Sequence, residues 1–125
     1  MDDEEISSHV VDASVRIHKE LGPGLLESAY MAALQIEFID RGIRYGCEFP
    51  IHGSYLRRPL GIVYQADMLV EARVLIEVKA VQSVEPIHVA QVLSYLRLGQ
   101  WRFGFLLNFN TPLMKTGIRR IVNGY

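Results

Sequence analysis

The sequence has little of three things: cysteine, net charge and long apolar stretches. Cys47 is its one cysteine, which excludes an internal disulfide and a cysteine-based zinc site and suits a reducing compartment. The formal net charge is −1. No whole-molecule field therefore attracts nucleic acid, and any such binding must come from a local patch.

No apolar stretch approaches the ~20 residues that are needed to span a bilayer. The N-terminal segment MDDEEISSHV is acidic where a secretory signal would be basic. We therefore expect a cytoplasmic protein with no membrane partner. Of the 125 residues, 50% are hydrophobic and 22% are charged, which predicts a single domain over residues 1–125 with a substantial core.

Two adjoining segments, Ile62–Val70 and Val74–Ala80, are expected to form two β-strands. Their residues alternate between two faces with a period of two, which fits strands better than a helix. The polar break at residues 71–73 is short enough to make them an antiparallel hairpin. The hairpin carries three charged side chains in segments that otherwise have the pattern of buried strands.

The register of this hairpin decides where its charged side chains meet. With a three-residue loop, Val70 pairs with Val74 and Asp67 faces Glu77, whereas a loop of two or four residues would shift the pairing. Opposed carboxylates destabilise a sheet, and Lys79 on the same face compensates only in part. A hard divalent cation held by carboxylate oxygens would offset the repulsion. The alternative is an ordinary solvated Glu-Lys pair on an edge hairpin.

The remaining segments give an α/β pattern around the hairpin. Two helices precede it, and a helix followed by an apolar strand comes after it, which indicates a crossover onto the sheet. Residues 57–61 are expected to turn the chain into the hairpin, and the tail GIRRIV to form an edge strand or a short helix. The pattern predicts a mixed β-sheet with helices on both sides. The expected elements are helices 2–21, 25–41 and 83–98 and strands 45–55, 62–70, 74–80 and 101–108.

Polar residues on two of these helices are candidates for a site. Glu27 stands in the first turn of the second helix, where a carboxylate complements the helix dipole. Because Tyr30 shares its apolar-leaning side, Glu27 points either to solvent or toward the sheet. On the third helix His88, Gln91 and Tyr95 form an uncharged stripe of side chains that can hydrogen-bond. This stripe is either a solvent-exposed side of the helix or the lining of a cleft.

Together these residues resemble the PD-(D/E)XK nuclease superfamily. The motif residues are Asp67, Glu77, Val78, Lys79 and Gln91, with an acidic residue on a preceding helix. More narrowly, GLLESAY at residues 24–30 looks like the signature of the small GxxExxY proteins of that superfamily. The segments IEVKAV, PIHVAQVLSYL and LLNF are similar too, so the resemblance covers residues 9–122. Ala66 departs from the pattern, because the superfamily's name has proline there.

The resemblance implies a restriction-endonuclease-like α/β core that hydrolyses phosphodiester bonds with a divalent metal. By position, Glu27, Asp67 and Glu77 would be acidic metal-site residues that hold Mg²⁺ or Mn²⁺, with the Val78 carbonyl and waters completing the shell. Lys79 would be the catalytic lysine. The residues expected to support the site are Gln91, Tyr30, His88 and Tyr95.

Three functions remain open at this point. The first is a metal-dependent nuclease acting on nucleic acid, with DNA preferred. The second is an inactive nuclease-fold module that binds nucleic acid or a protein partner, and the third is a subunit completed by a second copy or by another protein. The candidate phosphate contacts are Arg57, Arg58, Lys115, Arg119 and Arg120.

Overall fold

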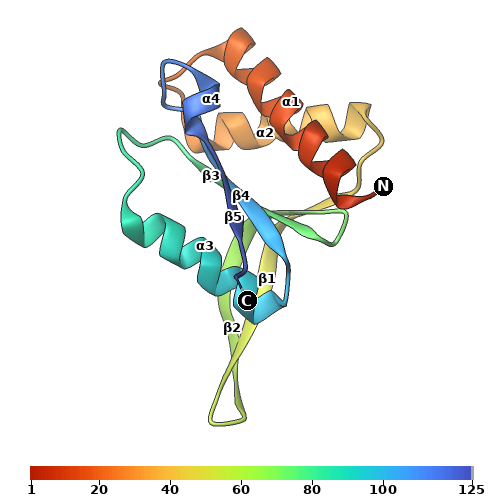
Figure 1. The fold of residues 1–125 in the computed structure, drawn as a ribbon, viewed down its shortest axis with the longest axis vertical. Coiled ribbons are helices and arrows are strands. Elements are labelled where there is room, and N and C mark those ends of the chain that lie inside the picture. Colours follow the sequence, from red (N-terminus) through yellow and green to blue (C-terminus); the bar gives the residue numbers. More distant parts are fainter. Residues whose placement is uncertain (125) are drawn as a thin grey trace.

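A five-stranded mixed sheet runs through the computed structural model, which describes residues 1–124 (Figure 1). The strands lie side by side in chain order, and β3 and β4 are parallel while the other neighbours are antiparallel. The elements are α1 (Asp3–Leu21), α2 (Glu27–Asp40), β1 (Tyr45–Tyr55), β2 (Arg58–Val70), β3 (Val74–Lys79), α3 (Pro86–Gly99), β4 (Phe103–Asn108), α4 (Met114–Gly117) and β5 (Ile118–Val122).

Helix α3 is the crossover that the parallel pair requires. Parallel strands cannot be joined by a tight turn, so the chain leaves β3, forms α3 across one face and returns to β4. Pro86 occupies the first turn of α3, where its missing N–H leaves no hydrogen bond unmade. The predicted crossover and mixed sheet are thereby confirmed.

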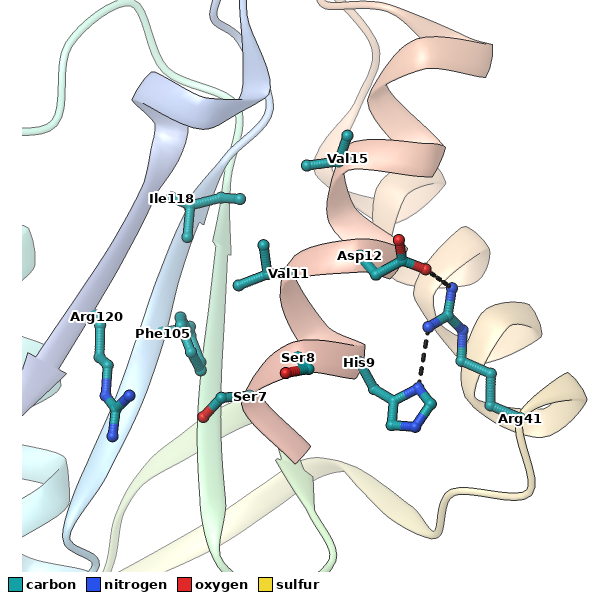
Figure 2. Close-up of a pocket in the computed structure, with 10 residues that line it drawn as sticks. All are labelled: Ser7, Ser8, His9, Val11, Asp12, Val15, Arg41, Phe105, Ile118 and Arg120. Atoms are coloured by element: carbon teal, nitrogen blue, oxygen red, sulfur yellow. Dashed lines mark hydrogen bonds and ion pairs between the residues drawn. The ribbon is translucent and has the colours of Figure 1, made fainter. Parts of the chain in front are cut away.

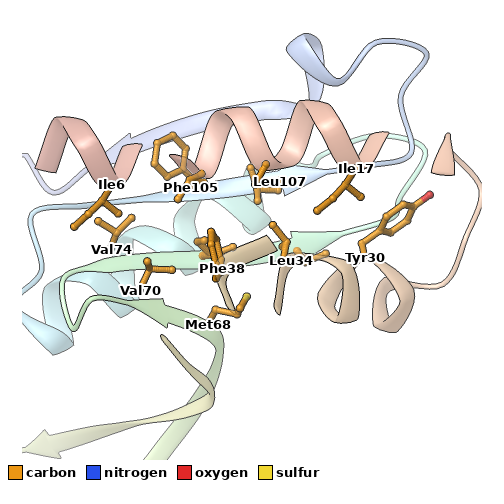
Figure 3. Close-up of a cluster of buried hydrophobic side chains, with 14 of the residues drawn as sticks. Ile6, Ile17, Tyr30, Leu34, Phe38, Met68, Val70, Val74, Phe105 and Leu107 are labelled. Carbon is orange, nitrogen blue, oxygen red and sulfur yellow. The ribbon is translucent and has the colours of Figure 1, made fainter. Parts of the chain in front are cut away.

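Helices cover both faces of the sheet, as predicted. Helices α1 and α2 pack on one face around a large apolar cluster, which includes Phe38, Phe105 and Leu107 (Figure 3). Helix α3 packs on the other face around Leu75, Leu96 and Leu106. Because side chains alternate along β3 and Leu75 faces α3, the side chains of Glu77 and Lys79 belong to the α3 side.

The prediction of a turn at residues 57–61 is wrong. Strand β2 already begins at Arg58, and the chain turns at Leu56 and Arg57, whose φ angles are 50° and 63°. The expected irregularity of β1 is present as shifts of register after Ile51 and after Gly53. The β1–β2 hairpin is therefore longer than the sequence indicated, and Figure 1 shows it extending away from the helices.

The ends of the helices differ from the predicted ends by at most three residues, and the largest difference is at the start of α3. Asp2 is the cap of α1, because its Oδ1 accepts a hydrogen bond of 2.8 Å from the Glu5 N–H. Helix α2 begins at Glu27, after an extended Leu26. The tail GIRRIV forms the edge strand β5, which is the first of the two expected alternatives, and the short helix α4 precedes it and ends at Gly117. Within residues 1–124, no helix combines the length and the apolar character that crossing a bilayer requires.

Candidate active site

The candidate site lies where β2 and β3 separate. Their ladder pairs Val70 with Val74 and continues to Met68 and Ile76, where it ends. From there β2 stays paired with β1, while β3 stays paired with β4 as far as Lys79. The two strands therefore open into a fork at the next residue pair. The predicted three-residue loop is confirmed by the Val70–Val74 pair.

Asp67 and Glu77 meet across this fork. The backbone N–H of Asp67 donates to Glu77 Oε1 at 3.2 Å, and the Val78 N–H donates to Asp67 Oδ2 at 2.8 Å. Carboxylate oxygens thus take the place of the backbone carbonyls that would continue the ladder. Each carboxylate uses one oxygen in these bonds.

Burial strongly perturbs these two carboxylates. Glu77 is 2% exposed, and burial, followed by the negative charge of Asp67, raises the pKa of Glu77 to about 8. Burial also raises the pKa of Asp67. The positive charge of Lys79 opposes both shifts.

Glu27 approaches the same place from α2. Its side chain is exposed, and its Oε2 accepts a hydrogen bond of 3.1 Å from the Ala80 N–H, one residue beyond Lys79. The negative charge of Glu27 contributes to the raised pKa of Asp67. The structure therefore places Glu27 at the end of β3, next to Lys79 in the chain, but does not bring its carboxylate onto the fork pair.

Tyr30 fixes the segment that carries Glu27. Its hydroxyl donates to the Gly22 carbonyl at 2.6 Å and accepts from the Leu25 N–H at 3.1 Å. Its buried ring stacks on Phe109, with ring centroids 4.4 Å apart. Tyr30 is thus a clamp on the loop before α2, and its hydroxyl makes no hydrogen bond to a carboxylate of the fork.

Replacing Tyr30 by Phe tests this clamp. Both backbone groups lose their partner but lie near solvent, so we expect Tyr30→Phe to lower the free energy of unfolding by about 1 kcal/mol. Urea denaturation measures the change. Tyr55→Phe is the matched control, since that side chain is 67% exposed. Equal losses in the two variants would contradict the clamp.

The polar stripe of α3 divides between two environments. The ring of Tyr95 stacks on Tyr64 of β2, with centroids 4.0 Å apart and planes at 12°. Burial is the main cause that raises the pKa of both tyrosines, and the charges of Asp67 and Glu77 add to it, so this pair borders the fork. Gln91 is half-buried on the same helix. His88 instead caps the start of α3, where its Nδ1 accepts from the Glu85 N–H at 3.0 Å.

Sequence reasoning missed Asn108, which supports the loop after Lys79. Asn108 is 3% exposed and pairs with Lys79 across the parallel strands. Its Nδ2 donates to the Val81 carbonyl at 3.0 Å, and its Oδ1 accepts from the Val81 N–H at 3.1 Å. The available signal was its position, because it is the polar residue that ends an apolar strand.

The five candidate phosphate contacts do not form one patch. Arg57 and Arg58 lie at the tip of the β1–β2 hairpin, whereas Arg119 and Arg120 lie on β5 at the opposite edge of the sheet. Lys115 is on the short helix α4 beside β5. All five side chains are exposed.

A hollow of about 900 Å³ lies away from the fork. Figure 2 shows it between α1 and strands β4 and β5. Phe105, which lines it, belongs to the cluster under α1 and α2, so the hollow lies on the face of the sheet opposite Glu77. Arg120 lines it, with its guanidinium 4.2 Å from the Phe103 ring, and an ion pair joins Arg41 to Asp12 at 2.6 Å. This hollow contains no carboxylate of the fork.

The oxygen donors of the fork fit a hard divalent cation in their chemistry. Two carboxylates share a buried position, each with a raised pKa, which is the arrangement that a bound cation stabilises. In the part of the chain that the structure describes, however, no three His, Cys, Asp or Glu side chains converge closely enough to hold a metal ion. The Glu27 carboxylate accepts a hydrogen bond from the Ala80 N–H and does not contact Asp67 and Glu77.

Comparison with known proteins identifies the family. Searches of curated proteins and of solved structures found no match. A family model described as the PD-(D/E)XK nuclease superfamily matches residues 4–121, a range that includes the fork, Glu27 and α3. This match extends over most of the 125 residues. The chain therefore belongs to the PD-(D/E)XK nuclease superfamily.

Proposed function

We propose that this protein is a divalent-metal-dependent nuclease that hydrolyses phosphodiester bonds in DNA. Membership of a nuclease superfamily suggests a nucleic acid substrate. The observation that carries the proposal is the fork, where hydrogen bonds hold Asp67 and Glu77 together with raised pKa values, and where Lys79 is the next residue of β3 on the same face as Glu77. Carboxyl groups with such raised pKa values are common at functional sites, because a structural role does not require two carboxylates that repel each other.

Each residue of the fork has a role in this proposal. Asp67 and Glu77, with Glu27 and the Val78 carbonyl, hold Mg²⁺ or Mn²⁺ through oxygen atoms. When bound, the ion makes water more acidic and offsets negative charge on the phosphate. Lys79 orients the attacking water or neutralises the charge that develops on the phosphoryl oxygens.

The polar residues around the fork complete the proposed site. Gln91 donates a hydrogen bond to the water or to a phosphate oxygen, and the stacked Tyr64 and Tyr95 form one wall. His88 acts indirectly, because it caps the helix that carries Gln91. Tyr30 positions Glu27, which gives the GxxExxY signature a physical reason and supports assignment to that narrower group.

Removing the amine of Lys79 tests the proposal. We expect Lys79→Ala to lower the rate of DNA cleavage in Mg²⁺ or Mn²⁺ by about 10²- to 10⁴-fold, the usual contribution of a group that moves or holds a proton. Cleavage of plasmid and of linear DNA measures the rate, with a chelator in parallel reactions. Lys19→Ala, an exposed change on α1, is the matched control and should cleave normally. Cleavage that survives both the chelator and Lys79→Ala would contradict the proposal.

One observation favours a second function, which is nucleic-acid binding without turnover. No three ligand side chains converge on a metal position within residues 1–124. A binding module would retain DNA in a gel-shift assay and show no cleavage with Mn²⁺ at any pH. The nuclease proposal instead requires turnover under the same conditions.

A further inference from the structure

The outer part of the β1–β2 hairpin, residues 52–63, is a free arm. Its base is fixed by Ile51, which is buried, and by Tyr64, which stacks on α3. Beyond these two residues every side chain of the arm is exposed, and the backbone of Gly53 is half-buried. Figure 1 shows the arm projecting from the body, with no helix beside its tip.

The arm presents an unusual set of side chains to solvent. It contains no acidic residue. Among residues 1–124 neither of its arginines makes an ion pair. Large apolar side chains accompany these charges, and such exposure marks an interaction surface. The exposed fractions are 67% for Tyr55, 70% for Leu56, 60% for Leu60, 56% for Ile62 and 43% for Val63.

The two residues at the tip of the arm have backbone conformations that their residue types rarely adopt. Leu56 and Arg57 form a two-residue turn with positive φ at both positions. Asn-Gly is the favoured pair there, because those residues adopt positive φ with little strain. A leucine and an arginine at these positions therefore indicate a role for the tip beyond closing the hairpin.

We propose that the arm lies in the major groove of duplex DNA, within one helical turn of the phosphate to be cut. A groove about 12 Å wide admits a two-stranded ribbon, whose strands are about 4.8 Å apart. Arg57 and Arg58 contact the phosphates that border the groove, and Leu56 contacts base edges. The absence of acidic residues makes the arm complementary to this polyanion.

The length of β2 sets the distance between the arm and the fork. Nine residue steps separate Arg58 from Asp67 in β2, but the two register shifts leave Val63 and Leu60 as extra residues in this strand, and β1 spans the same interval in seven steps. The interval is therefore about 23 Å at about 3.3 Å per residue, which is shorter than one helical turn of B-DNA, about 34 Å. A duplex that lies along β2 with its cut phosphate at the fork therefore meets the tip within one turn. This placement of the cut rests on the proposed nuclease function, whereas binding by the arm does not.

The same geometry discriminates between DNA and RNA. The major groove of an A-form RNA duplex is deep and narrow, and side chains cannot enter it. A single strand offers no groove for a ribbon. The parent protein should therefore bind a DNA duplex more tightly than an RNA duplex or a single strand of the same sequence.

A double substitution at the tip tests the arm without endangering the hairpin. Leu56→Asn with Arg57→Gly installs the favoured turn pair while removing both tip side chains. Binding of labelled DNA duplex, RNA duplex and single-stranded DNA by the full chain is measured by fluorescence anisotropy, in a chelator, over a range of salt. We expect the Kd for duplex DNA to rise roughly fivefold to tenfold, with a salt slope smaller by about 1. Arg16→Ala on α1 is the control and should change neither quantity.

Each outcome decides between the two proposals. The proposed role of the arm would be overturned if the double variant bound duplex DNA as tightly as the parent. It would also be overturned if the parent bound RNA duplex as tightly as DNA duplex. Neither result would contradict the proposal of cleavage at the fork. Loss of DNA binding in the double variant of a protein that never cleaves would support the arm and overturn the nuclease. Light scattering that shows a parent dimer and a monomeric variant, with unchanged DNA binding, would assign the arm to a second copy of the chain instead.

Discussion

Asp67→Asn should abolish metal-dependent cleavage while leaving the fold intact. Asparagine retains an oxygen that accepts from the Val78 N–H, so the hydrogen bond across the fork persists. The negative charge that would hold the cation is lost. Metal ions contribute several kcal/mol to stabilising charge in such reactions, and each ~1.4 kcal/mol is tenfold in rate. We therefore expect the rate to fall by about a thousandfold or more.

Controls separate this effect from instability and from contamination. Asp40→Asn replaces an exposed carboxylate at the end of α2 and should cleave at the parent rate. Asp67→Ala should be equally inactive but less stable, because the Val78 N–H loses its acceptor. Circular dichroism and thermal denaturation report the fold of each variant. Parent-level cleavage by Asp67→Asn would remove Asp67 from the site.

Glu77→Gln should make the protein less sensitive to pH. The folded pKa of Glu77 is about 8, above its ordinary value of 4.5, so between these pH values the folded state keeps a proton that the unfolded state releases. The contribution of Glu77 to the free energy of unfolding of the parent is therefore highest below about pH 4.5, falls as pH rises and levels off above about pH 8. The fall should be on the order of a few kcal/mol, and Asp67 adds to it in the same direction.

Denaturation by urea between pH 5 and 9 measures this dependence. Glutamine has the shape of glutamate and its oxygen still accepts from the Asp67 N–H, so the variant should match the parent at low pH and exceed it at high pH. Mn²⁺ should raise the Tm of the parent at pH 8 and have less effect on Glu77→Gln. Parallel pH profiles for the two proteins would show that Glu77 is not the buried acid described here.

The sequence predicted the strands and the helix that carry the site better than it predicted the geometry of the site. Alternation along β2 and β3 and the short polar loop predicted the Val70–Val74 pair, and the crossover through α3 followed from the order of the elements. The end of the ladder could not be predicted, because it depends on carboxylate oxygens that capture the N–H groups of Asp67 and Val78. Rules based on residue patterns describe backbone ladders and do not include hydrogen bonds from backbone N–H groups to carboxylate side chains.

Two further features were hidden for different reasons. The turn at Leu56 and Arg57 lacks the glycine or asparagine by which such turns are recognised. The sequence therefore placed the start of strand β2 too late, at Ile62 instead of Arg58. Tyr64 and Asn108 act on residues that are distant in the chain, and only the folded sheet brings them to the fork.

The fork also divides the two carboxylates between strands with different neighbours. Glu77 belongs to a strand that is paired with β4 and covered by helices, whereas Asp67 belongs to the strand that continues into the exposed hairpin. Strand β2 leaves β3 after the last ladder pair, Met68 with Ile76, and is next held where Tyr64 stacks on Tyr95 of α3. Asp67 lies between these two points of attachment, so the distance between the two acidic side chains depends on the aromatic stack as well as on the ladder.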